Sequence, residues 1–223
     1  MELLNVMAAK SVWLFDINDL NPQGKSFIPD LFAWLTERYQ FRTFPKSPSD
    51  LDETKGLAFK EGTGRTDEGD PINFELTIYN DGVIANTWSS TRYTDAFIEQ
   101  VLSGASKQFG LAYTPTMFRS KTHISELVFR MDRSLTDLDR RLNDFARELT
   151  KAFATESNLK FGPFIFSGLS FAIDSSSTSL KPASFAIERR IGAPFSENRF
   201  YSKSPLHTDN HLAALNAFEL LLL

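Results

Sequence analysis

The chain has 223 residues, of which 42% are hydrophobic and 23% are charged, proportions that are ordinary for a folded globular protein. It has no cysteine, which excludes disulfides, thiolate metal sites and a cysteine nucleophile. Its net charge of −4 argues against nonspecific nucleic-acid binding, because such binding depends on neutralising phosphates. The N-terminus lacks the basic and apolar regions of a signal peptide, and no apolar stretch is long enough to span a bilayer, so we expect a cytoplasmic protein without a membrane partner.

The first half of the sequence predicts the element order β-α-β-β-β-α. Apolar residues alternate where strands are expected and recur at helical spacing where helices are expected. Asn80-Asp81-Gly82 supplies the turn residues of a β-hairpin, and Thr94 is a suitable helix N-cap. The predicted elements are a strand at 11–15, a helix at 27–39, strands at 57–60, 72–78 and 83–88, and a helix at 95–109.

The second half predicts the same order. Ser134 or Thr136 introduces its first helix, Gly192-Ala193-Pro194 turns the chain between two strands, and Thr208 caps the last helix. The predicted elements are a strand at 123–131, a helix at 135–153, strands at 164–173, 184–191 and 198–203, and a helix at 209–223.

A repeated tetrapeptide favours an internal duplication. Gly-Leu-Ala-Phe at 56–59 returns as Gly-Leu-Ser-Phe at 168–171, 112 positions later. Adding 114 to the apolar row of the first helix also gives an apolar row: Ile28, Leu31, Leu35 and Tyr39 correspond to Leu142, Phe145, Leu149 and Phe153. We therefore expect an α+β fold of two similar halves, 1–112 and 113–223, related by a pseudo-twofold axis, with mostly antiparallel sheet and helices packed on it.

Catalytic and metal-binding motifs are scarce. The sequence has no P-loop, Gly-x-Ser-x-Gly elbow, kinase motif or dinucleotide fingerprint, so we expect no cofactor. His207 and His211, with Asp209 between them, could offer two imidazoles and a carboxylate to a metal, but no spacing marks a further ligand. We expect them to be surface residues at the start of a helix rather than a metal site, and His123 to be structural.

A group of basic residues occupies the predicted hairpin at 184–203. Alternation places Arg189 on the apolar face of its strand, together with Phe185, Ile187 and Ile191. A guanidinium on an apolar face needs either an internal carboxylate or a bound anion as its partner. The candidate anion ligands are Arg189, Arg190, Arg199 and Lys203.

The lack of catalytic motifs favours a non-enzymatic recognition or assembly protein that binds another protein or itself. Residues 1–112 hold 10 Lys and Arg against 16 Asp and Glu, whereas residues 113–223 hold 14 against 12, so the acidic first half suits a basic partner. An acidic first half without catalytic motifs also suits a toxin-neutralising or defence-operon accessory protein. The candidate partner-binding residues lie in an acidic loop and at the leucine-rich C-terminus: Asp67, Glu68, Asp70, Leu222 and Leu223.

Two other functional classes remain open. A small-anion or nucleotide sensor would use the arginines in a cleft between the halves, and a metal-dependent hydrolase would use His207, Asp209 and His211.

The four C-terminal leucines, residues 220–223, cover every side of a helical turn. We therefore expect some of them to be buried and others to meet a partner, since soluble monomers rarely expose large apolar patches.

Overall fold

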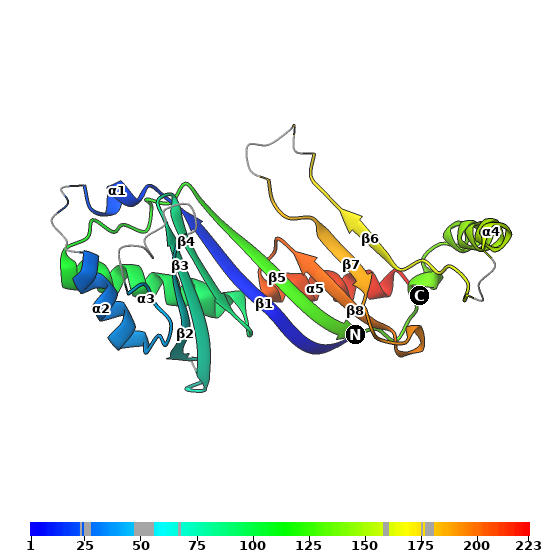
Figure 1. Ribbon diagram of the computed structural model, residues 1–223, viewed down its shortest axis with the longest axis horizontal. Coiled ribbons are helices and arrows are strands. Elements are labelled where there is room, and N and C mark those ends of the chain that lie inside the picture. The colour runs from blue at the N-terminus through cyan, green and yellow to red at the C-terminus, as the bar shows by residue number, and fades with distance from the viewer. Residues whose placement is uncertain are drawn as a thin grey trace. The chain divides into compact units, whose positions relative to one another are not determined.

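The computed structural model describes residues 1–22, 24, 28–46, 56–66, 68–157, 161–174, 176 and 181–223. Within these ranges the chain is α+β, with five α-helices and an eight-stranded, mostly antiparallel sheet (Figure 1). The chain forms two compact units. The N-terminal unit consists of Val6–Ser125 and Pro205–Thr208, and the C-terminal unit consists of Met1–Asn5, Glu126–Ser204 and Asp209–Leu223.

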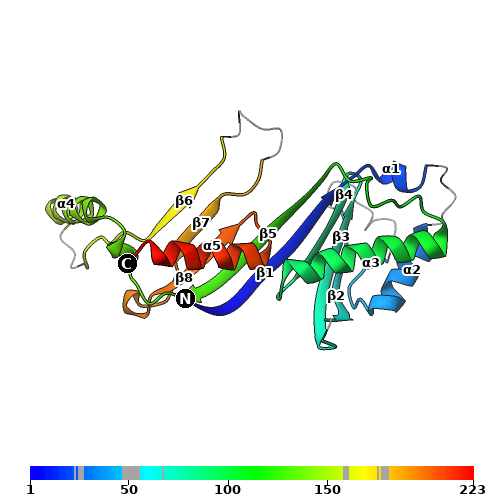
Figure 2. The ribbon, with the colours of Figure 1, turned by 180° about the vertical axis from the view of Figure 1, so that it is seen from behind.

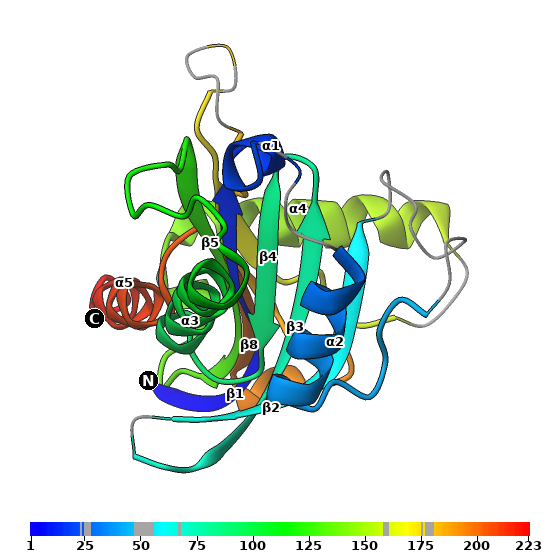
Figure 3. The ribbon, with the colours of Figure 1, turned by 90° about the vertical axis from the view of Figure 1, so that its left-hand side faces the viewer.

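The N-terminal unit packs two long helices on one face of its strands (Figure 3). Tyr79 pairs with Gly82, so Asn80 and Asp81 form the two-residue hairpin turn that the sequence predicts. The elements of this unit are β1 (Glu2–Leu14, from Val6 onward), α1 (Ile17–Leu20), α2 (Ile28–Tyr39), β2 (Leu57–Arg65), β3 (Pro71–Tyr79), β4 (Gly82–Thr87), α3 (Thr91–Phe109) and the first part of β5 (Ser120–Arg130).

Aromatic rings fill the space between these strands and their helices. Phe74 of β3 stacks on Phe97 of α3 with ring centroids 4.4 Å apart, and Tyr39 of α2 meets Phe97 edge-on at 4.9 Å. Phe59 and Ile98 are fully buried beside them. Inward-facing strand residues thus meet the apolar rows of the two helices. This agrees with side chains that repeat every 2.0 residues along a strand and every 3.6 residues along a helix.

The C-terminal unit has a smaller core. Ile187, Phe200 and Leu215 are fully buried, and the rings of Phe129 and Phe200 lie 5.8 Å apart. The elements of this unit are the rest of β5, a 3-10 turn (Leu135–Asp137), α4 (Arg140–Glu156), β6 (Gly168–Phe171), β7 (Phe185–Arg189), a second 3-10 turn (Phe195–Glu197), β8 (Arg199–Ser204) and α5 (Thr208–Leu220, from Asp209 onward).

Hydrogen-bonded neighbours give the strand order β2-β3-β4-β1-β5-β8-β7-β6. The antiparallel pairs include β1 with β4, β2 with β3, β3 with β4, β6 with β7, and β7 with β8. The predicted α+β class and the mostly antiparallel sheet are therefore confirmed. The internal duplication and its pseudo-twofold axis stay predictions.

Two predicted element starts are wrong. The strand expected at 11–15 is the end of β1, which begins at Glu2 and includes residues that the apolar pattern did not mark. Helix α3 begins at Thr91, because the side chain of Ser90 accepts a hydrogen bond from the Arg92 amide and caps the helix. Thr94 therefore lies inside the helix, where its hydroxyl donates to the Thr91 carbonyl oxygen.

Two predicted elements of the second half are also corrected. The single helix expected at 135–153 is a 3-10 turn followed by α4, because Asp139 accepts a hydrogen bond from the Arg141 amide and caps a new helix. The strand expected to continue to residue 191 ends at Arg189 as β7. Ile191 is consequently 94% exposed rather than part of the apolar face.

Candidate functional site

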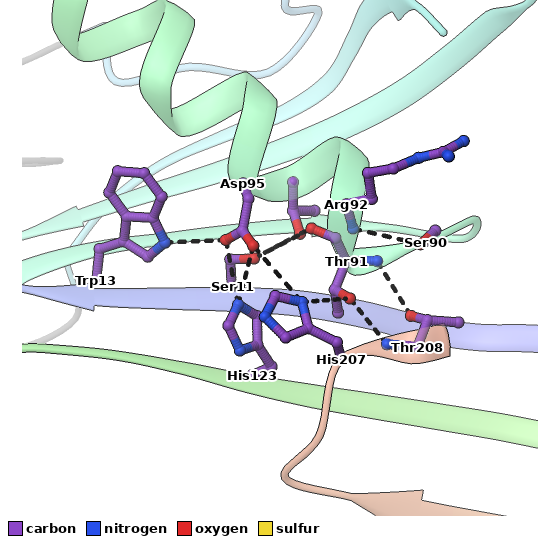
Figure 4. A network of polar contacts seen from close by, with 10 residues as sticks. Ser11, Trp13, Ser90, Thr91, Arg92, Asp95, His123, His207 and Thr208 are labelled. Atoms are coloured by element: carbon purple, nitrogen blue, oxygen red, sulfur yellow. Dashed lines mark hydrogen bonds and ion pairs between the residues drawn. The ribbon is translucent and has the colours of Figure 1, made fainter. Parts of the chain in front are cut away.

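The N-terminal unit brings a carboxylate and two imidazoles together near the start of α3 (Figure 4). The cap at Ser90 fixes the start of α3 and so places Asp95 in the first turns of the helix. His123 is supplied by β5, and His207 by the short segment Pro205–Thr208. One ligand atom from each of the three residues lies within 4.8 Å of the others.

Asp95 is close to both imidazoles. His123 Nε2 lies 3.0 Å from Asp95 Oδ2 and 3.2 Å from Oδ1, and His207 Nδ1 lies 3.7 Å from Oδ2. The two imidazole rings overlap, with centroids 3.5 Å apart. The side chain of His123 is 11% exposed and that of His207 is 46% exposed, so the cluster opens to solvent on the His207 side.

The carboxylate of Asp95 is held in place from the other side by Trp13. The indole Nε1 of Trp13 donates a hydrogen bond of 3.0 Å to Asp95 Oδ1 (Figure 4). Burial acts to raise the pKa of Asp95, but hydrogen bonds from His123, Ser11 and Trp13 outweigh it and hold that pKa below its ordinary value. Asp95 is therefore a fixed negative charge between the two imidazoles at neutral pH.

Buried hydroxyls fix the backbone that carries His207. The Thr91 amide donates to Thr208 Oγ1 at 3.0 Å, and the Thr208 amide donates to Thr91 Oγ1 at 2.9 Å. Thr91 Oγ1 also lies 3.4 Å from His207 Nδ1, a contact in which the donor depends on the imidazole tautomer.

Two imidazoles and a carboxylate form a ligand set that suits Zn²⁺ and other divalent first-row metals. The sequence-based interpretation paired His207 with Asp209 and His211, whereas the structure groups it with Asp95 and His123. Within the described ranges no second group of three His, Asp or Glu side chains has this spacing. Nothing in the local pattern could have found the group, because its three members come from three separate elements.

His211 is buried in the C-terminal unit, so the prediction that it lies on the surface is wrong. Its Nε2 is 2.8 Å from Ser202 Oγ, and that hydroxyl donates to the Ala186 carbonyl oxygen at 2.6 Å. Ser202 therefore accepts the Nε2 proton, and Nδ1 has no hydrogen-bond partner among the described residues. Burial lowers the pKa of His211 to about 4, so the ring is neutral at physiological pH.

The guanidinium of Arg189 is buried, as the alternation of β7 predicts. It donates to the Phe195 carbonyl oxygen at 3.0 Å and to Ser134 Oγ at 3.1 Å, and it lies over the rings of Phe195 and Phe200. Among the described residues no carboxylate pairs with it, and its Nε has no hydrogen-bond partner. Burial lowers the pKa of Arg189, which is the sign of a charge that its surroundings do not fully compensate.

The four basic candidates do not converge on one site. Arg189 and Arg190 line an open pocket of about 550 Å³ at one end of β6 and β7, together with the backbone around Gly192. Arg199 instead pairs with Glu197 at 2.8 Å, and Lys203 lies 3.6 Å from Glu126. The structure thus retains two of the four residues as candidates for an anion site.

The predicted partner-binding residues differ in their exposure. Glu68 is exposed and is contacted by Tyr93 and Arg92, and Asp70 is also exposed. Asp67 lies outside the described residues. At the C-terminus Leu222 is buried at 4% exposure, while Leu223 is 81% exposed.

Helix α4 in the C-terminal unit leaves much of its apolar face exposed, although the ring of Phe153 contacts the rings of Phe161 and Phe164. The residues of this face are spaced to lie on one side of the helix and have large exposed fractions: Leu142 36%, Phe145 61%, Leu149 39% and Phe153 40%. The corresponding residues Leu35 and Tyr39 of α2 are packed against the sheet, at 1% and 6% exposure. The two helices therefore carry the same pattern but have different surroundings.

The same unit has a sheet face that is exposed at its β6 edge. Phe171 pairs with Phe185 and Leu169 pairs with Ile187, so these four side chains lie on one face of β6 and β7. This is the face on which α5 packs, because the ring of His211 contacts Phe185. Figure 2 shows α5 over β8, and Ile187 of β7 is fully buried, whereas Phe171 of the edge strand β6 is 60% exposed.

Neither a scan against protein-family models nor a search of the curated proteins found a match to this chain. Within the described ranges, none of the helices combines the length and the apolar character needed to cross a membrane. Function is therefore inferred from the geometry of the described residues.

Proposed function

We propose that the protein is a self-assembling recognition protein in which α4 of one copy docks on the β6–β7 face of a second copy. The observation that carries this proposal is the largely exposed apolar face of α4, formed by Leu142, Phe145, Leu149 and Phe153. Each copy would supply one helix and one sheet face, so two equivalent contacts would form around a twofold axis.

The energetic reason is the cost of leaving this face in water. Burying a large apolar side chain fully contributes about 1.5–3 kcal/mol, so covering the exposed part of the four side chains would contribute about 3–5 kcal/mol. Each dimer has two such contacts, so this burial free energy would count twice, before the cost of association is subtracted. The opposite side of α4 carries the ion pairs Arg147–Asp144 and Lys151–Glu148, so only one face of the helix is suited to an apolar partner.

A second copy is favoured as the occupant because the same chain offers a matching surface. In the N-terminal unit, α2 covers strands with the row of side chains that corresponds to the largely exposed row of α4. In the C-terminal unit, β6 presents Leu169 and the 60% exposed Phe171 on the side where such a helix would lie, next to Phe185 of β7, which α5 also contacts. Helix exchange between copies would cover both surfaces at once.

Cysteine cross-linking tests this contact directly, because the natural chain has no cysteine. A protein with Phe145→Cys is mixed with a protein with Phe171→Cys, and disulfide-linked dimers are followed after oxidation. We expect the mixed pair to form a disulfide, and a matched Arg147→Cys variant, altered on the charged side of α4, to form none with Phe171→Cys. Equal cross-linking by both α4 variants would contradict the proposed orientation.

Light scattering tests the assembly itself. The unmodified chain should have the mass of a dimer, and Leu149→Glu should have the mass of a monomer while retaining its helical circular dichroism. If the unmodified chain is a monomer at high concentration, self-assembly is wrong. A monomer that binds a different protein, such as a toxin, through Phe145 and Leu149 would replace the second copy by another partner and would also overturn the proposal.

Anion binding is a second candidate function, favoured by one specific observation. The buried guanidinium of Arg189 has no carboxylate partner among the described residues and borders an open pocket that Arg190 also lines. An anion of the size of phosphate at this pocket would supply the missing negative charge. The neighbouring Glu188 lies in the same lining and would weaken that attraction, so we place this function second.

We also infer that the two halves of the chain derive from a duplication. Outward from β1 and β5, the strand order is β4-β3-β2 on one side and β8-β7-β6 on the other. The repeated tetrapeptide supports this inference, since Gly56 immediately precedes β2 and Gly168 begins β6. In an experimental structure, a superposition of 11–109 on 123–222 that placed Gly56 and Gly168 in unrelated elements would contradict it.

A further inference from the structure

We propose that Asp95, His123 and His207 bind a divalent transition metal, with Zn²⁺ as the expected ion. The ligand atoms would be Asp95 Oδ2, His123 Nε2 and His207 Nδ1, which are the facing atoms of the cluster in Figure 4. The site lies within the N-terminal unit, and its residues are separate from those of the proposed assembly surface.

The spacing of the ligand atoms fits a tetrahedral ion. Zn²⁺ binds nitrogen and oxygen ligands at about 2.0–2.2 Å, so neighbouring ligands of a tetrahedral site lie about 3.4 Å apart. Asp95 Oδ2 lies 3.0 Å from His123 Nε2 and 3.7 Å from His207 Nδ1, on either side of that value. All three ligand atoms lie within 4.8 Å of one another, so side-chain rotations would bring them around the ion.

The contacts of the two imidazoles also suit metal ligands. His207 Nδ1 faces Asp95 Oδ2 and lies 3.4 Å from Thr91 Oγ1, and an entering metal would take the lone pair of this nitrogen in place of the Thr91 contact. His123 Nε2 faces the Asp95 carboxylate and donates its proton to it, and an entering metal would replace that proton, which leaves to solvent. Both imidazoles would bind the ion as neutral ligands, one on each side of the carboxylate.

A second shell of hydrogen bonds supports the ligands. Trp13 Nε1 donates to Asp95 Oδ1 at 3.0 Å, which leaves Oδ2 as the oxygen that faces His207. The exchanged hydrogen bonds between Thr91 and Thr208 fix the segment that carries His207. The side chain of His207 is 46% exposed, so the fourth position of a bound ion would be open to water.

The alternative is that the three residues form only a hydrogen-bonded cluster. Calorimetric titration of the chelator-treated chain with Zn²⁺ alone distinguishes the two. We expect one ion per chain, and at least about 100-fold weaker binding in both Asp95→Asn and His207→Ala. Asp95→Asn keeps the shape of the side chain, and His207 is exposed enough for its removal to leave the fold intact, which circular dichroism checks.

Two further variants separate a metal site from a general effect of charge. Trp13→Phe removes the indole N–H from Asp95 and should weaken Zn²⁺ binding about 10-fold. Asp209→Asn makes the same charge change outside the cluster and should leave the affinity unchanged. Co²⁺ in place of Zn²⁺ should give the intense visible absorption of a four-coordinate site, and this absorption should disappear in His207→Ala.

Two results would overturn the site. One is the absence of Zn²⁺ binding by the unmodified chain. The other is binding of equal affinity by Asp95→Asn, His207→Ala and Asp209→Asn, which would place the ion elsewhere. A protein that binds Zn²⁺ but stays monomeric would leave this site in place and refute only the assembly proposal.

Discussion

Lowering the pH should destabilise the C-terminal unit through His211. The imidazole is fully buried, it donates Nε2–H to Ser202, and its Nδ1 has no partner among the described residues. Protonation of Nδ1 would bury an unpaired positive charge, and burial accordingly lowers the pKa from 6.5 to about 4. Between these two values the unfolded chain binds more protons than the folded chain, so stability that is present above pH 6.5 is lost as the pH falls towards 4.

The size of the effect follows from the two pKa values. Linkage of protonation to folding gives a loss of about 2 kcal/mol between pH 7 and pH 5, and of about 3 kcal/mol by pH 4. A loss of this size is a large part of the typical stability of a domain, which is about 5–15 kcal/mol. It should therefore be measurable in a urea titration.

The comparison uses the unmodified chain and His211→Leu, which fills a similar volume and cannot titrate. Far-UV circular dichroism is the suitable signal, because Trp13, Trp34 and Trp88 all lie in the N-terminal unit and their fluorescence would not report on His211. The free energy of unfolding is measured at pH 7, 6 and 5. We expect the unmodified chain to lose about 2 kcal/mol more than His211→Leu over this range.

Groups elsewhere in the chain titrate in both proteins, so their contributions cancel in the difference. If the free energies of unfolding of the two proteins change in parallel from pH 7 to pH 5, the buried neutral state of His211 is wrong. An additional Ser202→Ala variant, which removes the acceptor of Nε2–H, should destabilise the unit at pH 7 by about 1–3 kcal/mol, because the imidazole donor is then left unsatisfied.

Two further predictions concern the anion pocket and one glycine. If phosphate binds beside Arg189, inorganic phosphate should raise the melting temperature of the unmodified chain. Arg190→Ala should abolish that rise, whereas Arg199→Ala, which changes a residue outside the pocket, should keep it. Equal rises in melting temperature in all three proteins would exclude the pocket as the phosphate site. Gly82→Ala should cost more than about 2 kcal/mol of unfolding free energy, since the φ angle there is 155° and an added Cβ would lie 2.3 Å from the Trp13 carbonyl oxygen. Gly162→Ala, where nothing lies within 4 Å of an added Cβ, should change stability by less than about 0.5 kcal/mol in the same urea titration, and equal effects of the two substitutions would contradict this reasoning.

The sequence by itself determined the order of the strands and long helices, but not the short helix α1, and most of their buried faces. Alternation in β3 and the turn residues Asn80 and Asp81 predicted the hairpin to β4, and helical spacing predicted α2. These patterns are local, since each depends on a repeat of 2.0 or 3.6 residues along one element. They predicted element boundaries less well, because caps such as Ser90 and Asp139 compete with other suitable residues nearby.

Tertiary structure alone decided which polar residues meet. Asp95, His123 and His207 come from a helix, a strand and a connecting segment, so no spacing along the sequence could group them. The same limit applies to α4, whose apolar row matches that of α2 and yet is exposed. Periodicity shows which side of an element is apolar. What covers that side depends on the strand order and on the position of each helix. Strand order and helix position are set by contacts between residues far apart in the chain.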